Sequence, residues 1–190
     1  MARLLIALAL LVQPAAAAAD FAEDLARAAE ERTKRLVTYD PSYVRLAYPM
    51  GDPPDDRGVC SDVVIRAFRG VGIDLQVLVH EDMRRAFSAY PNIWGLTRTD
   101  RNIDHRRVPN LETFFRRKGA ELPVSAQAKD YLPGDVVSWR LPNGLPHIGI
   151  VSTARAPSGR PLIVHNIGAS TRAEDMLFDF DIVGHFRFRK

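Results

Sequence analysis

The chain has 190 residues, of which 46% are hydrophobic and 26% are charged, and its formal net charge is +3 at pH 7. This length allows one domain with a sizeable core, and the hydrophobic content excludes a chain that is disordered throughout. The small net charge does not indicate a nucleic-acid-binding protein, so we expect no nucleic-acid partner.

Residues 1–19 have the pattern of a secretory signal peptide. A charged residue precedes a short apolar run at residues 4–12, and alanines follow at residues 15–19. This pattern predicts cleavage after Ala17 or Ala19. The alternative is an uncleaved anchor, although the apolar run is too short to span a bilayer. We therefore expect a periplasmic or secreted protein whose mature form, residues 20–190, is a single domain with no transmembrane span.

Helical spacing of apolar residues dominates the first half of the predicted mature chain. Residues 20–36 form an expected amphipathic helix with Asp20 as its N-cap, and residues 37–54 favour extended or turning backbone because they contain several prolines. Three further helices are predicted: one from near Cys60 to Gly70 or Gly72, one after the N-cap Asp74, and one at residues 111–118.

Cys60 is the only cysteine in the chain. An exported protein usually keeps its cysteines in disulfides, so a lone thiol is either buried and inert or reactive for a purpose. Its expected place at the first turn of a helix favours a lowered pKa and a partly ionised thiolate, because the helix start stabilises an anion. We therefore treat Cys60 as a candidate nucleophile.

The connection at residues 92–110 is irregular and basic. Long connections of this kind often have a function, although a charged run is also typical of a solvated surface. We expect substrate contact from His105, Arg106 and Arg107, since arginine binds carboxylates through two parallel hydrogen bonds.

The second half of the chain changes to the alternating pattern of β-strands. Strands are predicted at residues 136–141, 147–151, 162–166 and 182–189, separated by turns that contain glycine, proline and asparagine. The order of helices first and an antiparallel meander afterwards predicts the α+β fold class.

A cysteine nucleophile needs a base, and the base needs a group that orients it. Among the five histidines, His80 is expected on a helix surface and His185 on a solvated strand face. His147 begins one predicted strand and His165 ends the next. A turn is predicted at residues 156–160; if residue 153 faces residue 161 across it, Gly149 faces His165 and His147 lies diagonally beside His165, about 7–8 Å away between Cα atoms. A slip of one residue in this register would separate the two rings.

These residues define a set of predicted roles. Cys60 is the nucleophile, His147 the general base, and His165 the orienting residue, with Asn166 as the alternative. Backbone N–H groups at the start of the Cys60 helix would hold the oxyanion. Asp62 could bind a substrate amine, or it could simply stabilise the start of the helix.

A metal site is the other chemistry that these side chains allow. Cysteine and histidine are zinc ligands, so Cys60, His147 and His165 could in principle bind zinc. The chain has neither the CxxC nor the HExxH spacing of common zinc sites. We therefore expect no metal and no cofactor.

The motifs resemble those of the NlpC-type cell-wall cysteine peptidases, which have a papain-like core. The resemblance rests on a cysteine that opens a helix, a Leu-Pro-Gly-Asp-Val strand start, a His-Ile-Gly-Ile strand and a polar residue on the following strand. These motifs stand here at residues 58–64, 132–139, 147–151 and 164–166. The resemblance implies a papain-like fold, with Cys60, His147 and His165 as its catalytic residues.

A closer resemblance is to the bacterial family of unknown function numbered 1287. It covers nearly the whole mature chain and includes the stretch Asn-Ile-Asp-His-Arg-Arg-Val-Pro-Asn-Leu at residues 102–111. Together the two resemblances imply an exported thiol amidase or peptidase that acts on peptidoglycan stem peptides or another envelope peptide. Two alternatives stay open, an acyl transferase that uses the same residues and a catalytically silent envelope-binding module. The bond cleaved, any activating partner and the oligomeric state stay open as well.

Overall fold

The structure is a computed structural model that describes residues 14–190. Residues 1–13, which hold most of the predicted signal peptide, lie outside the described residues, so the cleaved signal stays a prediction. Within residues 14–190, no helix is both long enough and apolar enough to cross a bilayer.

The described part of the chain contains the helices that the sequence predicts, with shifted boundaries: the helix predicted at residues 20–36 is Pro14–Glu31, and the one predicted at residues 111–118 is Val108–Arg117. The first helix begins at Pro14, so Asp20 lies inside it and our N-cap there was wrong; the alanines that precede Asp20 are strong helix formers. Asp74 is an N-cap, as predicted, because its side chain accepts the backbone N–H of Gln76 at 3.1 Å. The helices are α1 (Pro14–Glu31), α2 (Cys60–Gly70), α3 (Leu75–Arg85) and α4 (Val108–Arg117).

An antiparallel six-stranded sheet follows, in the spatial order β3-β8-β4-β5-β6-β7. Its strands are β3 (Glu121–Leu122), β4 (Val136–Arg140), β5 (Pro146–Arg155), β6 (Pro161–Asn166), β7 (Thr171–Glu174) and β8 (Asp181–Phe186). The four predicted strands are confirmed as β4, β5, β6 and β8. The short strands β3 and β7 at the two edges were not predicted. A separate two-residue parallel ladder joins β1 (Thr38–Tyr39) to β2 (Arg57–Gly58), directly before α2.

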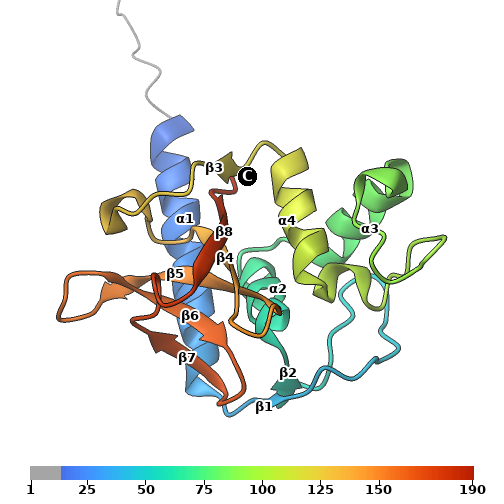
Figure 1. Cartoon of the computed structure of the whole chain (residues 1–190), viewed down its shortest axis with the longest axis horizontal. Coiled ribbons are helices and arrows are strands. Elements are labelled where there is room, and N and C mark those ends of the chain that lie inside the picture. Colours follow the sequence, from blue (N-terminus) through green and yellow to red (C-terminus); the bar gives the residue numbers. More distant parts are fainter. Residues whose placement is uncertain (1–13) are drawn as a thin grey trace, which may run out of the picture.

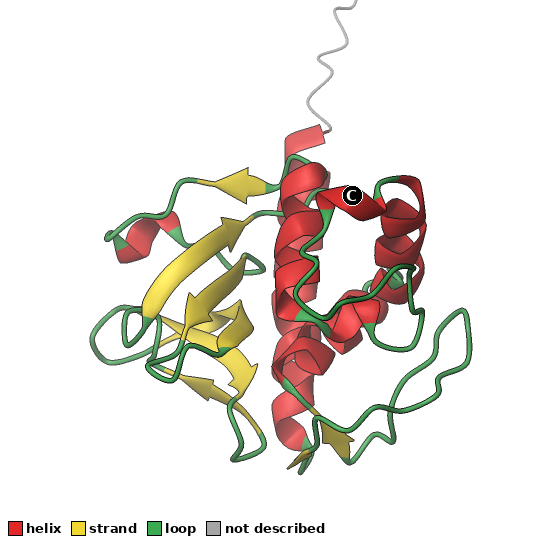
Figure 2. Ribbon diagram, turned by 45° about the vertical axis from the view of Figure 1, so that its right-hand side comes forward, coloured by secondary structure: helices red, strands yellow, loops and turns green. Residues whose placement is uncertain are grey.

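The helices and the sheet form two adjoining layers, and the expected α+β class is confirmed (Figures 1 and 2). α1 runs along the sheet and packs against α2 and β5. The larger hydrophobic core lies between the helices and the sheet and includes Val64, Phe68, Phe115 and Ile150. A smaller core on the opposite face of the sheet includes Tyr131, Val137, Trp139, Ile163 and Leu177.

Both faces of the central strands are therefore buried, which overturns one expectation. His185 on β8 was predicted to be solvated, but only 1% of its surface is exposed. Its ring stacks on Tyr131 with the ring centroids 4.3 Å apart, and its Nε2 lies 2.7 Å from the Asp135 carboxylate. The alternating pattern of β8 indicated a single buried face, whereas the segment that contains Tyr131 covers the second face.

Candidate active site

Cys60 is the first residue of α2 and follows a loop that α2 itself holds in place. The guanidinium of Arg66, one to two turns into the helix, donates hydrogen bonds to the backbone carbonyls of Pro53, Pro54 and Arg57. Its Nε also donates to the Asp52 carboxylate at 2.8 Å. Because one rigid side chain gathers several carbonyls, the backbone that leads to Cys60 has a defined path.

The Cys60 thiol is buried, with 5% of the residue exposed. The backbone N–H groups of Ile148 on β5 and of Ser61 and Cys60 at the start of α2 favour the ionised form of the thiol and tend to lower its pKa. Burial nevertheless raises the pKa of Cys60 to about 12, and the nearby Asp62 carboxylate adds to the rise. Our expectation of a lowered pKa was wrong, because the loss of hydration outweighs the helix start. The resting side chain is a neutral thiol.

The register of β5 and β6 brings two histidines together. Ile150 faces Val164, which puts Gly149 opposite His165, as the sequence predicts. The predicted turn at residues 156–160 is confirmed, but the expected pairing of residue 153 with residue 161 was wrong: Arg155 faces Pro161, and a bulge between Val151 and Arg155 takes up the difference. The bulge lies beyond the histidines, so it leaves their register unchanged.

The two histidine side chains are in direct contact. His147 Nε2 lies 3.0 Å from His165 Nδ1, and the two rings are nearly perpendicular at 85°. Gly149 makes the contact possible, because a Cβ at this position would lie 3.1 Å from His165 Cβ and only 2.9 Å from the Val164 carbonyl oxygen. Both histidines are buried, with 2% of each residue exposed.

A third residue, Glu174 on β7, extends this chain of contacts. Its Oε2 lies 2.9 Å from His165 Nε2. The sequence analysis missed Glu174 because the four-residue strand β7 was not predicted. The signal that could have found it is the turn at residues 168–170, which allows another short strand to pair with β6 and to bring one of its side chains beside His165.

The hydrogen-bond partners determine where the protons lie. An ionised carboxylate only accepts hydrogen bonds, so His165 Nε2 carries a proton and donates it to Glu174. In a neutral ring His165 Nδ1 then accepts, and His147 Nε2 must be the donor at the 3.0 Å contact. The unprotonated nitrogen of His147 is therefore Nδ1. This is the arrangement of a base that is held in one tautomer by a partner behind it.

Burial also sets the charge of the pair. It lowers the pKa of His147 to about 3, and the nearby His165 adds to the shift. Burial lowers the pKa of His165 as well, although the Glu174 carboxylate opposes the change. At neutral pH both rings are uncharged, so the resting site contains a thiol and an imidazole rather than an ion pair.

Cys60 and His147 line the same cleft, which has a volume of about 700 Å³. The walls come from the start of α2, from the loop before β5 and from the segment that leads to α4. Most of the lining is apolar: it includes Tyr39, Pro41, Trp94, Ile103, Leu141, Leu145, Ile167 and Phe180. Trp139 lies behind His147, with their ring centroids 5.8 Å apart. The cleft therefore offers a reactive pair of side chains in a largely apolar groove.

Two residues that we expected to contact substrate, Asp62 and Arg106, are paired with each other, and Arg106 also lines the cleft. Arg106 Nε and Nη2 donate to the two carboxylate oxygens of Asp62 at 2.8 and 2.9 Å, and both side chains are almost completely buried. Asp62 also accepts the backbone N–H of Val59 at 2.7 Å. The pair joins the basic segment to the start of α2. Its geometry supports the structural role that we considered for Asp62 rather than the binding of a substrate amine.

The remaining predicted contact residues occupy different places. His105 is 1% exposed and does not line the cleft. Arg107 does line it, and its guanidinium lies over the Trp94 ring at 4.0 Å. Asn166 does not contact the histidines, since its side chain bonds to the backbone of Gly58 and Gly168. Of the two orienting residues proposed from the sequence, His165 is the one that touches His147.

No set of three or more His, Cys, Asp or Glu side chains within residues 21–190 is arranged to hold a metal ion. Cys60, His147 and His165 share one region of the molecule without converging on a common point, because His147 Nε2 and His165 Nδ1 are directed at each other.

The fold and the cleft define a class: an α+β protein in which a cysteine at a helix start and a buried histidine pair from the sheet line one groove. The chain belongs to the family described as domain of unknown function DUF1287, whose pattern matches residues 26–188. A relative of this chain is the Escherichia coli (strain K12) protein named "Uncharacterized protein YijF". It is 56% identical over 164 residues, which are 86% of this chain and 80% of the relative.

Two solved structures are similar to this chain to different degrees. An N-acetylmuramoyl-L-alanine amidase from Bacteroides uniformis matches with a TM-score of 0.54 and 13% identity. The match covers 90% of this chain and 100% of the amidase chain. NlpC1 from Trichomonas vaginalis has a TM-score of 0.44 and 15% identity over 89% of this chain, which spans 44% of that protein. Because the identity to the amidase is only 13%, this similarity shows that the two proteins share a fold.

Proposed function

We propose that this protein is an exported cysteine-dependent amidase or peptidase that hydrolyses amide bonds in peptidoglycan stem peptides. The observation that carries the proposal is the contact chain from Glu174 through His165 to His147, which leaves His147 Nδ1 unprotonated in a residue that lines the same cleft as Cys60. The amidase fold of the Bacteroides protein and the signal pattern at residues 1–19 support a substrate in the cell envelope.

In the acylation step, Cys60 Sγ attacks the carbonyl carbon of the amide while His147 Nδ1 takes the thiol proton. Attack and proton transfer occur together, because the pKa of the resting thiol is too high for a free thiolate at neutral pH. Backbone N–H groups at the start of α2 hold the oxyanion. The C–N bond then breaks, and His147 returns the proton to the leaving amine.

In the deacylation step, His147 removes a proton from water, and the resulting hydroxide attacks the thioester carbonyl. The C–S bond breaks, the thiolate recovers the proton from His147, and the carboxylic acid leaves. His147 is an imidazolium in each of the two tetrahedral intermediates and is neutral in the acyl-enzyme between them. The His165 ring lies between His147 and the Glu174 carboxylate. His165 accepts a hydrogen bond from the imidazolium, and the negative charge of Glu174 compensates its positive charge.

The decisive experiment incubates the purified protein with muropeptides and identifies the products by mass spectrometry. We expect cleavage by the wild type and none by Cys60→Ala or His147→Ala. Arg155→Ala, an exposed change at the turn between β5 and β6, is the control and should cleave normally. No cleavage by the wild type, or equal cleavage by Cys60→Ala, would contradict the proposal. An added amine acceptor distinguishes hydrolysis from acyl transfer, because a transferase forms a new amide.

A silent binding module is the second candidate, and the observation that favours it is the burial of an uncharged Cys60. The two functions differ in how the thiol reacts with a substrate-like electrophile. A peptide aldehyde should form a reversible adduct with Cys60 of an amidase, which can be detected by mass spectrometry, and none with an inert thiol. Muropeptide binding without adduct or cleavage would support the module.

A further inference from the structure

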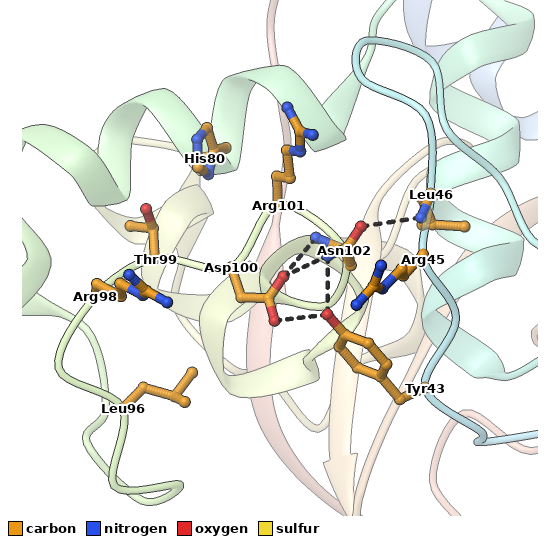
Figure 3. A pocket seen from close by; sticks show the side chains of 10 residues that line it. All are labelled: Tyr43, Arg45, Leu46, His80, Leu96, Arg98, Thr99, Asp100, Arg101 and Asn102. Atoms are coloured by element: carbon orange, nitrogen blue, oxygen red, sulfur yellow. Dashed lines mark hydrogen bonds between the residues drawn. The ribbon is translucent and has the colours of Figure 1, made fainter.

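A second cavity of about 800 Å³ lies beside the cleft and shares none of its lining residues. Its walls come from three elements: the segment before Gly51, the connection at residues 96–102, and His80 on α3. Figure 3 shows this pocket, with side chains from all three elements around one central group. Its volume is in the range of pockets that bind small molecules, about 300–1,000 Å³.

A network of neutral and acidic side chains holds the two loops of this pocket together. Asp100 accepts the Tyr43 hydroxyl at 3.0 Å and the Asn102 side-chain N–H at 2.9 Å. Asn102 also donates to the Tyr43 oxygen at 2.8 Å and accepts the backbone N–H of Leu46 at 2.9 Å. These bonds, drawn in Figure 3, connect the two loops to each other. The pocket is therefore held open by its own framework, before any ligand arrives.

Three arginines surround this framework, and no carboxylate of residues 21–190 forms a salt bridge or hydrogen bond with any of them. They are Arg45, Arg98 and Arg101. Other arginines near these loops are paired: Arg66 with Asp52, Arg69 with Asp74 and Arg106 with Asp62. In the view of Figure 3 the three unpaired guanidinium groups lie on different sides of the Asp100 network.

The charge of the pocket is therefore positive. Its only carboxylate, among the residues that line it, is Asp100, which already accepts hydrogen bonds from Tyr43 and Asn102. His80 also lines the pocket; burial lowers its pKa, and its Nδ1 has no hydrogen-bond partner within the described residues. Three arginines without a carboxylate partner thus line a cavity whose one lining carboxylate is already engaged, and the Arg101 guanidinium also lies over the Tyr48 ring at 5.7 Å.

We propose that this pocket is a binding site for an anionic group, either a carboxylate or a phosphate, on a small molecule or on the end of a polymer. Guanidinium groups bind both anions through paired N–H donors, and Arg45, Arg98 and Arg101 can approach the anion from separate directions. Thr99, which also lines the pocket, adds a hydroxyl group to the polar surface. The site does not depend on the chemistry of Cys60.

The test measures binding of two probes, pyrophosphate and citrate, by isothermal titration calorimetry at constant ionic strength. Constant ionic strength matters because exposed charges attract any anion weakly, and salt screens that attraction. We expect at least one probe to bind in the wild type and in Cys60→Ala. Binding of pyrophosphate alone identifies a phosphate ligand, and binding of citrate alone identifies a carboxylate ligand.

The variants are Arg45→Gln and Arg98→Gln, whose exposed side chains make no contact that folding needs. Each should weaken the bound probe at least tenfold. Arg155→Gln is the matched control, since this exposed arginine bonds only to the Gly159 carbonyl and lies outside the pocket. If neither probe binds, or if all three variants weaken binding equally, the pocket is not an anion site. Loss of binding in the two pocket variants without loss of muropeptide cleavage would support this site independently of the proposed function.

Discussion

His165 Nδ1 lies 3.0 Å from His147 Nε2, and this contact places the unprotonated nitrogen of His147 at Nδ1. The direction of the hydrogen bond depends on Glu174, because its carboxylate requires a proton on His165 Nε2. Three residues from three neighbouring strands therefore act as one unit, and the first prediction concerns the outermost of them.

Replacing Glu174 should slow catalysis without preventing substrate binding. In Glu174→Gln the side-chain oxygen can still accept from His165, but the negative charge that stabilises an imidazolium on His147 is lost. We expect kcat to fall about tenfold, and up to about a hundredfold in Glu174→Ala, with little change in KM. Steady-state kinetics on a muropeptide measures both constants. Glu121→Gln, on the exposed strand β3, is the control and should retain full activity. A rise in KM with no change in kcat would contradict the proposed role of Glu174 in stabilising the imidazolium.

The pH dependence of thiol alkylation should reveal the charge state of Cys60. Burial raises the pKa of this thiol to about 12 and lowers that of His147 to about 3. The thiolate fraction therefore rises tenfold for each pH unit between pH 5 and 10, and the alkylation rate should rise with it and show no plateau. Iodoacetamide labelling followed by mass spectrometry gives the rate.

The same experiment in His147→Ala provides the contrast. Because His147 is neutral above its low pKa, its removal should leave the shape of the alkylation profile unchanged. A plateau between pH 5 and 8 in the wild type that disappears in His147→Ala would instead indicate a thiolate–imidazolium pair and would contradict the neutral resting state.

The buried pair of Arg106 and Asp62 should contribute to stability through charge compensation. Arg106→Met leaves the Asp62 carboxylate buried without its partner, and we expect a loss of about 3–5 kcal/mol in the free energy of unfolding. Adding Asp62→Asn removes the buried charge while an amide oxygen can still accept the Val59 N–H. The double variant should therefore be more stable than Arg106→Met alone.

Urea unfolding measures this recovery. Arg116→Met is the control, because Arg116 forms an exposed ion pair with Glu121, and such pairs contribute about 0–1 kcal/mol. If the double variant were as unstable as the sum of the two single changes, the two side chains would be contributing independently rather than as a pair.

Gly149→Ala should separate the two histidines. The added methyl group would lie 2.7 Å from Ile163 Cγ2 and 2.9 Å from the Val164 carbonyl oxygen, so β5 and β6 must shift apart locally. We expect a loss of about 1–3 kcal/mol in stability. Because the histidine contact spans the same two strands, we also expect a fall in kcat. A variant that loses stability but keeps full kcat would show that the register tolerates the shift.

Several features of the site follow from local sequence patterns. The start of α2 at Cys60 is set by apolar spacing after a proline-rich loop, and the pairing of β5 with β6 near the histidines is set by which residues alternate toward the core. Both are short-range properties, because a helix repeats every 3.6 residues and a strand every two. The proximity of His147 and His165 could therefore be inferred before the structure was known.

Other features depend on contacts between distant segments. Burial of the thiol reversed the pKa shift expected from the helix start, and the burial of His185 depends on Tyr131, which lies far from it in the sequence. Arg106 and His105 belong to a charged run that is typical of a surface, yet Arg106 turns inward because Asp62 offers a buried partner. No local pattern encodes these outcomes.

The sequence by itself determined the α+β order of the elements, the place of Cys60 at a helix start and the register that brings His147 beside His165. Only the tertiary structure decided that Glu174 completes the contact chain, that the resting thiol and imidazole are neutral, and that Arg45, Arg98 and Arg101 surround a separate pocket. The physical reason is that helix and strand periodicity act over a few residues, whereas hydration and charge pairing depend on which remote groups share the same space.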